Sequence, residues 1–145
     1  LGNGGAAGSR LPSIVAVILA ILVGDVAIKH FVMRIRPYLV IPGAPTLDTL
    51  KYPISYSFPS GHSFFFFAGA TVLFRSCRRL GIAAYGLACV VAFSRMYLFM
   101  HFPSDVLTGA VLGIIIGNIA WQICGYTKKA AVLLRQPLFT LVVQD

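Results

Sequence analysis

The chain has 145 residues, of which 58% are hydrophobic and 11% are charged, and its mean hydropathy is +0.85. A soluble domain carries roughly 25% charged residues, so this composition excludes a soluble globular protein and indicates an integral membrane protein. The formal net charge is +8, but the basic residues lie at the ends of apolar segments, which is typical of membrane spans and argues against nucleic acid as a partner.

Four apolar segments are predicted to be transmembrane helices. They cover residues 12–33, 64–74, 80–100 and 105–124. A hydrocarbon core of about 30 Å needs about 20 helical residues, so the second segment is short unless the turn before it is also helical. Pro12 is well placed to begin the first helix. We therefore expect an all-α, polytopic transmembrane helix bundle with four spans.

The remaining segments define the expected domain organisation. Residues 1–11 are predicted to form a flexible N-terminal segment, residues 12–126 the membrane domain and residues 127–145 a C-terminal tail that is too short and too broken to span. The loop at residues 38–57 is rich in proline and is long enough to act as a lid or substrate rim.

The basic residues predict the orientation of the spans in the cell membrane. Arg10, the arginines at positions 75, 78 and 79, and Lys128 with Lys129 lie at alternate span ends, which are expected to be cytoplasmic. Three polar groups then share the extracytoplasmic face: residues 29–36, 60–62 and 94–105. Basic residues on that face run against the usual tendency, and an anionic ligand held there would explain them.

The turn Phe58-Pro59-Ser60-Gly61-His62-Ser63 precedes the second apolar segment. Pro59 suits the first turn of a helix, and Ser60 and Gly61 offer backbone N–H groups where the helix dipole favours an anion. His62 places a titratable ring beside that position. A helix cap with an incidental histidine has the same sequence, so the turn alone leaves both interpretations open.

Three motifs occur in order along the chain. Lys29 precedes Arg36-Pro37 by seven positions, Pro59-Ser60-Gly61-His62 follows, and Ser94-Arg95 leads to His101 and then Asp105. Together they resemble the three-part signature of the type 2 phosphatidic acid phosphatase superfamily, which also includes vanadium haloperoxidases and bacterial acid phosphatases. Members in membranes usually have six spans with the motifs in the last four, so the first two helices are expected to be missing here.

The resemblance implies a set of site residues. The predicted catalytic residues are His101, which forms a phosphohistidine, His62, which protonates the leaving oxygen, and Asp105, which holds the second nitrogen of His101. The predicted phosphate-binding residues are Lys29, Arg36, Ser60, Gly61 and Arg95. Fixed positive charges and planar guanidinium groups suit the charged oxygens of a transferring phosphoryl group. The resemblance implies neither a metal nor another cofactor.

The implied activity is hydrolysis of a phosphate monoester or diphosphate of a membrane lipid. Small bacterial relatives point to undecaprenyl diphosphate, ahead of phosphatidylglycerophosphate and phosphatidic acid. Two alternatives stay open: a vanadate-dependent haloperoxidase and a non-catalytic lipid-binding or scrambling relative. Gly109, Gly113 and Gly117 recur every four residues, which predicts close helix packing either within the bundle or between subunits of a homo-oligomer.

Overall fold

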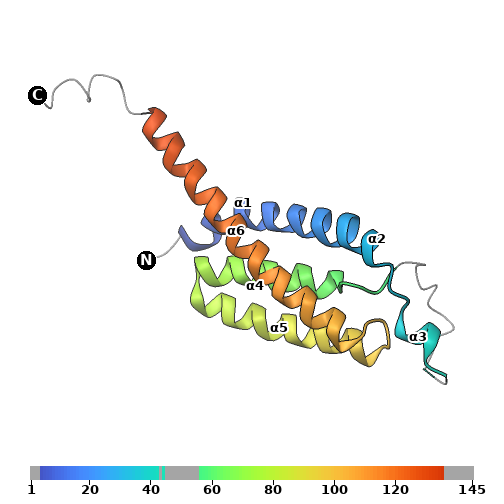
Figure 1. The fold of residues 1–145 in the computed structure, drawn as a ribbon. Helices are drawn as coiled ribbons and strands as arrows, with labels where there is room; N and C mark the ends of the chain where they lie inside the picture. The colour runs from blue at the N-terminus through green and yellow to red at the C-terminus, as the bar shows by residue number, and fades with distance from the viewer. Residues whose placement is uncertain (1–3, 43, 45–55, 136–145) are drawn as a thin grey trace, which may run out of the picture.

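The computed structural model of the protein describes residues 4–42, 44 and 56–135, and all regular structure within these residues is helical. This confirms the predicted all-α class. The first helix, α1 (Gly4–Ala20), continues through a π-helical segment, η1 (Ile21–Ile28), into α2 (Lys29–Val32) (Figure 1). The other helices are α3 (Pro37–Val40), α4 (Gly61–Ser76), α5 (Arg78–Tyr97) and α6 (Pro103–Arg135).

Three stretches of the described chain are long and apolar enough to cross a membrane: Arg10–Val40, Arg78–Tyr97 and Pro103–Thr127. The helix at the position of the second predicted span, α4, has 16 residues. At 1.5 Å per residue it extends about 24 Å, which is shorter than the hydrocarbon core of about 30 Å. It begins at Gly61, so the turn before the apolar run is helical.

The first and last helices extend beyond their predicted ends. Residues 4–9, which we expected to be flexible, belong to α1, and Pro12 lies inside this helix rather than at its start. In an apolar environment unpaired backbone groups are costly, which favours continuing a helix past a single proline. At the other end α6 reaches Arg135, so residues 127–135 of the predicted tail are helical.

Two predictions concern residues outside the described part of the chain. The proposed lid covers residues 38–57, of which 43 and 45–55 are not described, and only the short helix α3 is seen at its start. Residues 136–145 of the predicted tail also lie outside the described residues.

The central helix is α4, which contacts α1, α5 and α6. A Cβ added at Gly109, Gly113 or Gly117 of α6 would lie 2.5, 2.5 or 2.7 Å from a backbone carbonyl oxygen of α4 or of its N-cap, Ser60. The predicted close packing is therefore within the chain. A subunit contact through these glycines was the wrong alternative, because α4 covers that face of α6.

Helix direction places three distant segments at one end of the bundle. The α2–α3 connection, the N-terminus of α4 and the loop between α5 and α6 lie at this end, whereas the α4–α5 turn lies at the other (Figure 1). Farther along the bundle, the helices meet through small residues. The buried core there consists of Ala16, Ala68, Val72 and Ala120, with Val15 and Trp121 packed against it.

Candidate active site

A cavity of about 450 Å³ lies at the end of the bundle where the three motifs meet. Six of the eight predicted site residues line it: Lys29, Arg36, Gly61, His62, Arg95 and His101. The two others, Ser60 and Asp105, are buried and are not among the lining residues. The fold therefore brings residues more than 70 positions apart in the sequence to one cavity wall.

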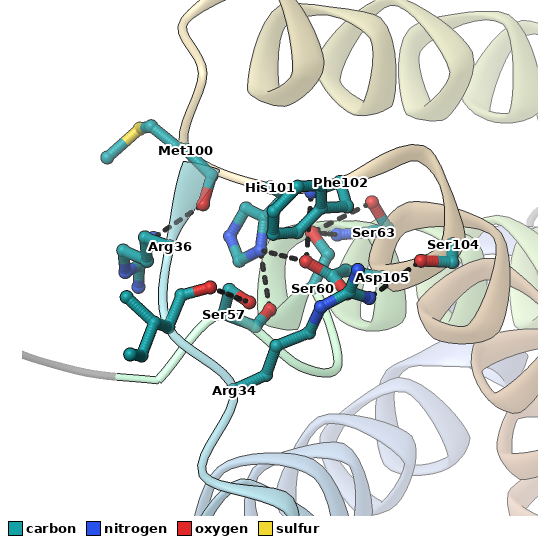
Figure 2. Close-up of polar contacts among 11 residues, drawn as sticks. Arg34, Arg36, Ser57, Ser60, Ser63, Met100, His101, Phe102, Ser104 and Asp105 are labelled. Carbon is teal, nitrogen blue, oxygen red and sulfur yellow. Dashed lines mark hydrogen bonds and ion pairs between the residues drawn. The ribbon is translucent and has the colours of Figure 1, made fainter. Parts of the chain in front are cut away.

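His101 is buried, and its ring is held from the side of Nδ1. Nδ1 lies 2.7 Å from the carbonyl oxygen of Ser57 (Figure 2). In the neutral ring Nδ1 therefore carries the proton, and Nε2 keeps its lone pair. Burial lowers the pKa of His101 to about 4, and the positive charge of Arg36 acts in the same direction, whereas the bond to Ser57 opposes them. The ring is neutral at pH 7 and suited to nucleophilic attack.

Asp105 does not bond directly to His101, and this corrects the predicted contact. Its Oδ2 lies 3.9 Å from Nδ1 of His101, which is beyond hydrogen-bond distance. Instead, Oδ2 accepts a hydrogen bond from the backbone N–H of Phe102 at 2.9 Å. Oδ1 accepts one from Nη1 of Arg34 at 2.7 Å. As expected, Asp105 lies in the first turn of α6, where a carboxylate is favoured by the helix dipole.

Ser57 was not predicted as a site residue. It is fully buried, and its carbonyl oxygen accepts the Nδ1 hydrogen bond of His101. Its N–H donates to the carbonyl oxygen of Arg34 at 2.8 Å, and its hydroxyl donates to the carbonyl oxygen of Ile35 at 3.2 Å. Ser57 lies outside the motif residues, and a backbone carbonyl leaves no signature in a sequence.

Ser60 caps α4 instead of lining the cavity. Its hydroxyl oxygen accepts hydrogen bonds from the N–H of Ser63 at 3.4 Å and from the Ser63 hydroxyl at 3.0 Å. Its N–H donates to the carbonyl oxygen of Asp105 at 3.0 Å. The Ser60 N–H that was expected beside an anion is thus committed to Asp105, and the hydroxyl oxygen serves as an acceptor for the helix start. Pro59 precedes this cap after a cis peptide bond and does not begin the helix.

Gly61 is the first residue of α4 and lines the cavity. The N–H groups of a first helical turn have no acceptor within the helix and favour an anion, so Gly61 lies where its predicted phosphate contact would require it. The neighbouring His62 is exposed and lines the same cavity. His62 therefore shares the cavity wall with His101, and a positive charge on it is the smallest of the influences that lower the pKa of His101.

The two motif arginines are linked through Met100. Nη1 of Arg36, a nearly buried side chain, donates to the carbonyl oxygen of Met100 at 3.2 Å. Nη1 of Arg95 lies 3.7 Å from the sulfur of the same residue. The N–H groups of Met100 and His101 both point to the carbonyl oxygen of Arg95, at 3.1 and 3.3 Å. The loop after α5 thereby fixes His101 relative to both guanidinium groups.

Part of the cavity wall is apolar. Ala20 and Ile21, at the junction of α1 and η1, and Phe65 and Phe66 of α4 line it. The cavity therefore joins a cationic end that contains a neutral imidazole to a surface that suits a hydrocarbon chain. Within the described residues, no three His, Cys, Asp or Glu side chains are grouped to hold a metal ion.

Comparisons with known proteins agree with these features. The sequence model of the PAP2 superfamily matches residues 11–129. Undecaprenyl-diphosphatase of Sulfolobus acidocaldarius is 33% identical over 125 residues, which are 84% of this chain and 59% of that protein. The chain spans about half the length of the curated relatives it matches.

Two crystal structures share the fold at 29% sequence identity. Aquifex aeolicus LpxE aligns with a TM-score of 0.68, covering 80% of this chain and 68% of that one. The transmembrane PAP2-type phosphatidylglycerolphosphate phosphatase from Bacillus subtilis aligns with a TM-score of 0.63, covering 86% and 65%.

Proposed function

The chain belongs to the PAP2 superfamily, and from this premise we propose that it hydrolyses the phosphate monoester or diphosphate of a membrane lipid without a metal ion. One observation carries the proposal. A buried, neutral His101 shares a cavity with Lys29, Arg36 and Arg95, and an apolar wall adjoins them. Such a site combines a nucleophile, fixed charge for phosphate oxygens and room for a lipid chain.

In the proposed reaction, Nε2 of His101 attacks phosphorus. The bond from phosphorus to the leaving oxygen breaks, and protonated His62 gives this oxygen its proton. Water then attacks the phosphohistidine, His62 takes a proton from that water, and the P–N bond breaks to release inorganic phosphate. Lys29, Arg36 and Arg95 neutralise the charge that develops on the equatorial oxygens.

The supports of His101 fit this chemistry. The Ser57 carbonyl keeps the proton on Nδ1, so Nε2 is the nitrogen with a free lone pair. Phosphorylation makes the ring cationic. The carboxylate of Asp105, with Oδ2 at 3.9 Å from Nδ1, then stabilises that charge without accepting the proton.

We propose undecaprenyl diphosphate as the first candidate substrate, ahead of phosphatidylglycerophosphate and phosphatidic acid. The similarity to the undecaprenyl-diphosphatase of Sulfolobus acidocaldarius supports this order. The wall formed by α1, η1 and α4 would receive the first part of the lipid chain next to its phosphate. The chemistry of the cavity is common to all three lipids, so the order is decided by experiment.

We also propose that the cavity faces the extracytoplasmic side of the cell membrane. Arg75 ends α4, and Arg78 begins α5 at the turn opposite the cavity end of the bundle (Figure 1). Arg10 lies in the first half of α1, away from α2 and the cavity. By the positive-inside tendency the arginine-rich end is cytoplasmic.

The direct test is phosphate release by the purified protein in detergent from a panel of lipid phosphates and diphosphates. We expect release to be fastest with undecaprenyl diphosphate, to be inhibited by vanadate and to be insensitive to a chelator. Loss of activity with the chelator would contradict metal independence. No release from any lipid would contradict the hydrolase, and lipid scrambling or vanadate-dependent bromide oxidation would then support one of the two alternatives.

A further inference from the structure

We propose that Arg34 is a positioning residue for His101, acting through Asp105 and the start of α6. The proposal rests on the function proposed above, in which His101 is the nucleophile. Arg34 is not among the residues that line the cavity, and its side chain is partly exposed. Its role would therefore be indirect.

The guanidinium group of Arg34 contacts the first turn of α6 and the residue that precedes it in three ways. Its Nη1 has two hydrogens, and it donates to Oδ1 of Asp105 and to Oγ of Ser104, each at 2.7 Å (Figure 2). Its central carbon lies 4.0 Å from the centre of the Phe102 ring, a cation–π contact. These three partners lie within four positions after His101, so Arg34 fixes the chain that follows the histidine.

The backbone of Arg34 holds the other support of His101. Its carbonyl oxygen accepts the N–H of Ser57 at 2.8 Å, and the Ser57 carbonyl accepts Nδ1 of His101 at 2.7 Å. Arg34 follows Met33, whose left-handed backbone (φ 48°) ends α2. The chain leaving the first span thus contacts both the acceptor of the Nδ1 proton and the nearby carboxylate.

The side chain of Arg34 keeps the Asp105 carboxylate from replacing the Ser57 carbonyl as the acceptor of the Nδ1 proton of His101. Asp105 is fully buried, and its oxygens are directed to Arg34 and to the N–H of Phe102. Nδ1 of His101 therefore stays on Ser57, with the carboxylate 3.9 Å away. Without the guanidinium group, Oδ1 loses its cation and the carboxylate can turn toward Nδ1. The ring would then be pulled from its orientation.

Loss of the Arg34 guanidinium group also alters the electrostatic environment of His101. The charges of Arg36, Lys29 and His62 lower the pKa of His101, and Oδ2 of Asp105 lies 3.9 Å from its Nδ1. In the parent, the charge of Asp105 is balanced by Arg34. Removal of this balance leaves a carboxylate that favours the imidazolium form, so the pKa of His101 rises.

The test compares Arg34→Gln and Arg34→Lys with the parent in steady-state phosphate release, pH profile and thermal unfolding. For Arg34→Gln we expect kcat to fall about 10- to 100-fold with KM nearly unchanged, since misplacing a reacting group acts on the chemical step. The acid limb of kcat/KM should move up by about one pH unit. Measuring all variants on one substrate removes the contribution of substrate ionisation.

Arg34→Lys restores the positive charge but not the planar fork. We expect it to return the acid limb to the parent position and to recover only part of kcat. Arg75→Gln is the matched control, because Nε of Arg75 donates to Oδ1 of Asn118 at 3.0 Å on an exposed surface far from the cavity. It should leave kcat and the pH profile unchanged.

Two results would overturn the proposal. One is an Arg34→Gln variant with the kcat and acid limb of the parent. The other is a loss of activity in both variants that only follows the loss of folded protein, with no shift of the acid limb. Failure of the proposed function is distinguishable, because the parent would then release no phosphate, or His101→Asn would be as active as the parent.

Discussion

The contact between α4 and α6 changes character along its length. At the helix starts it is polar: the N–H of Ser60 donates to the carbonyl oxygen of Asp105 at 3.0 Å. From Gly109 onward the contact is made by glycines against the α4 backbone. The first region includes a buried carboxylate and adjoins a buried imidazole, whereas in the second the helices approach most closely at glycines and the polar contact between Arg75 and Asn118 lies on the exposed surface.

Within this one helix pair, the polar region positions the groups proposed to react, and the glycine region stabilises the fold. Close backbone packing fixes how near α6 lies to α4, and thereby where Asp105 and His101 are placed relative to the start of α4. Polar contacts at the end then select ring orientation and tautomer. We therefore expect substitutions that remove or misplace the His101 ring at the polar end to change activity most, and substitutions along the glycines to change stability most.

The largest expected effect on activity follows from His101→Asn. The asparagine amide can still donate a hydrogen bond toward the Ser57 carbonyl, but it supplies no nucleophilic nitrogen. Phosphate release should fall by at least about 10³-fold, while the melting temperature stays close to that of the parent. Activity within tenfold of the parent would place the nucleophile elsewhere.

The reverse pattern is expected for Gly113→Ala in the glycine region. The new Cβ would lie 2.5 Å from the Phe64 carbonyl oxygen, so α6 must move away from α4. Overpacking of this kind costs about 1–3 kcal/mol of unfolding free energy, with loss of activity only where folded protein is lost. Gly125→Ala in the same helix is the control, since nothing lies within 4 Å of its added Cβ. Equal stability of the two variants would contradict the packing account.

The buried imidazole predicts a pH dependence of stability. The pKa of His101 is lowered from 6.5 to about 4 in the folded protein, so between these values only the unfolded state binds the proton. The free energy of unfolding should therefore fall as pH decreases from 6.5 to about 4, by up to roughly 3 kcal/mol, with no contribution above pH 6.5. Chemical unfolding of the parent and of His101→Asn across this range isolates the effect. Parallel curves for the two proteins would show that His101 is not buried as neutral imidazole.

The smallest expected effect concerns Ser60, which the structure assigns to the helix cap. Ser60→Ala removes the acceptor for the Ser63 N–H and hydroxyl, which should lower the unfolding free energy by about 1 kcal/mol. KM and the inhibition constant for vanadate should stay near the parent values. A clear rise in both, with unchanged stability, would restore Ser60 as a phosphate ligand.

The residues that meet at the cavity were predictable because each is a chemically distinctive type within a motif. Their secondary partners were not. Arg34 and Arg36 are two positions apart, and spacing alone does not say that one contacts the start of α6 while the other lines the cavity. Ser57 acts through its backbone carbonyl, and any residue type has one.

The fold, too, was only partly predictable from the sequence. Apolar length predicted the helical class and four spans, of which three correspond to stretches long and apolar enough to cross a membrane, because burial in a membrane depends mainly on composition. Helix ends were less predictable: Pro12 suggested a start that α1 passes through, and α6 continues to Arg135. The glycine spacing predicted close packing but could not name α4 as the partner, since the same surface also suits a second subunit.

The most direct test of the account is to trap the covalent intermediate. Rapid mixing of the parent with lipid substrate labelled in its terminal phosphate, followed by quenching in base and mass spectrometry, should find an acid-labile phosphoryl group on His101 that forms and decays at rates consistent with turnover. His101→Asn should carry no such label. Turnover without a labelled histidine, or a label on a different residue, would contradict the claim that His101 is the nucleophile.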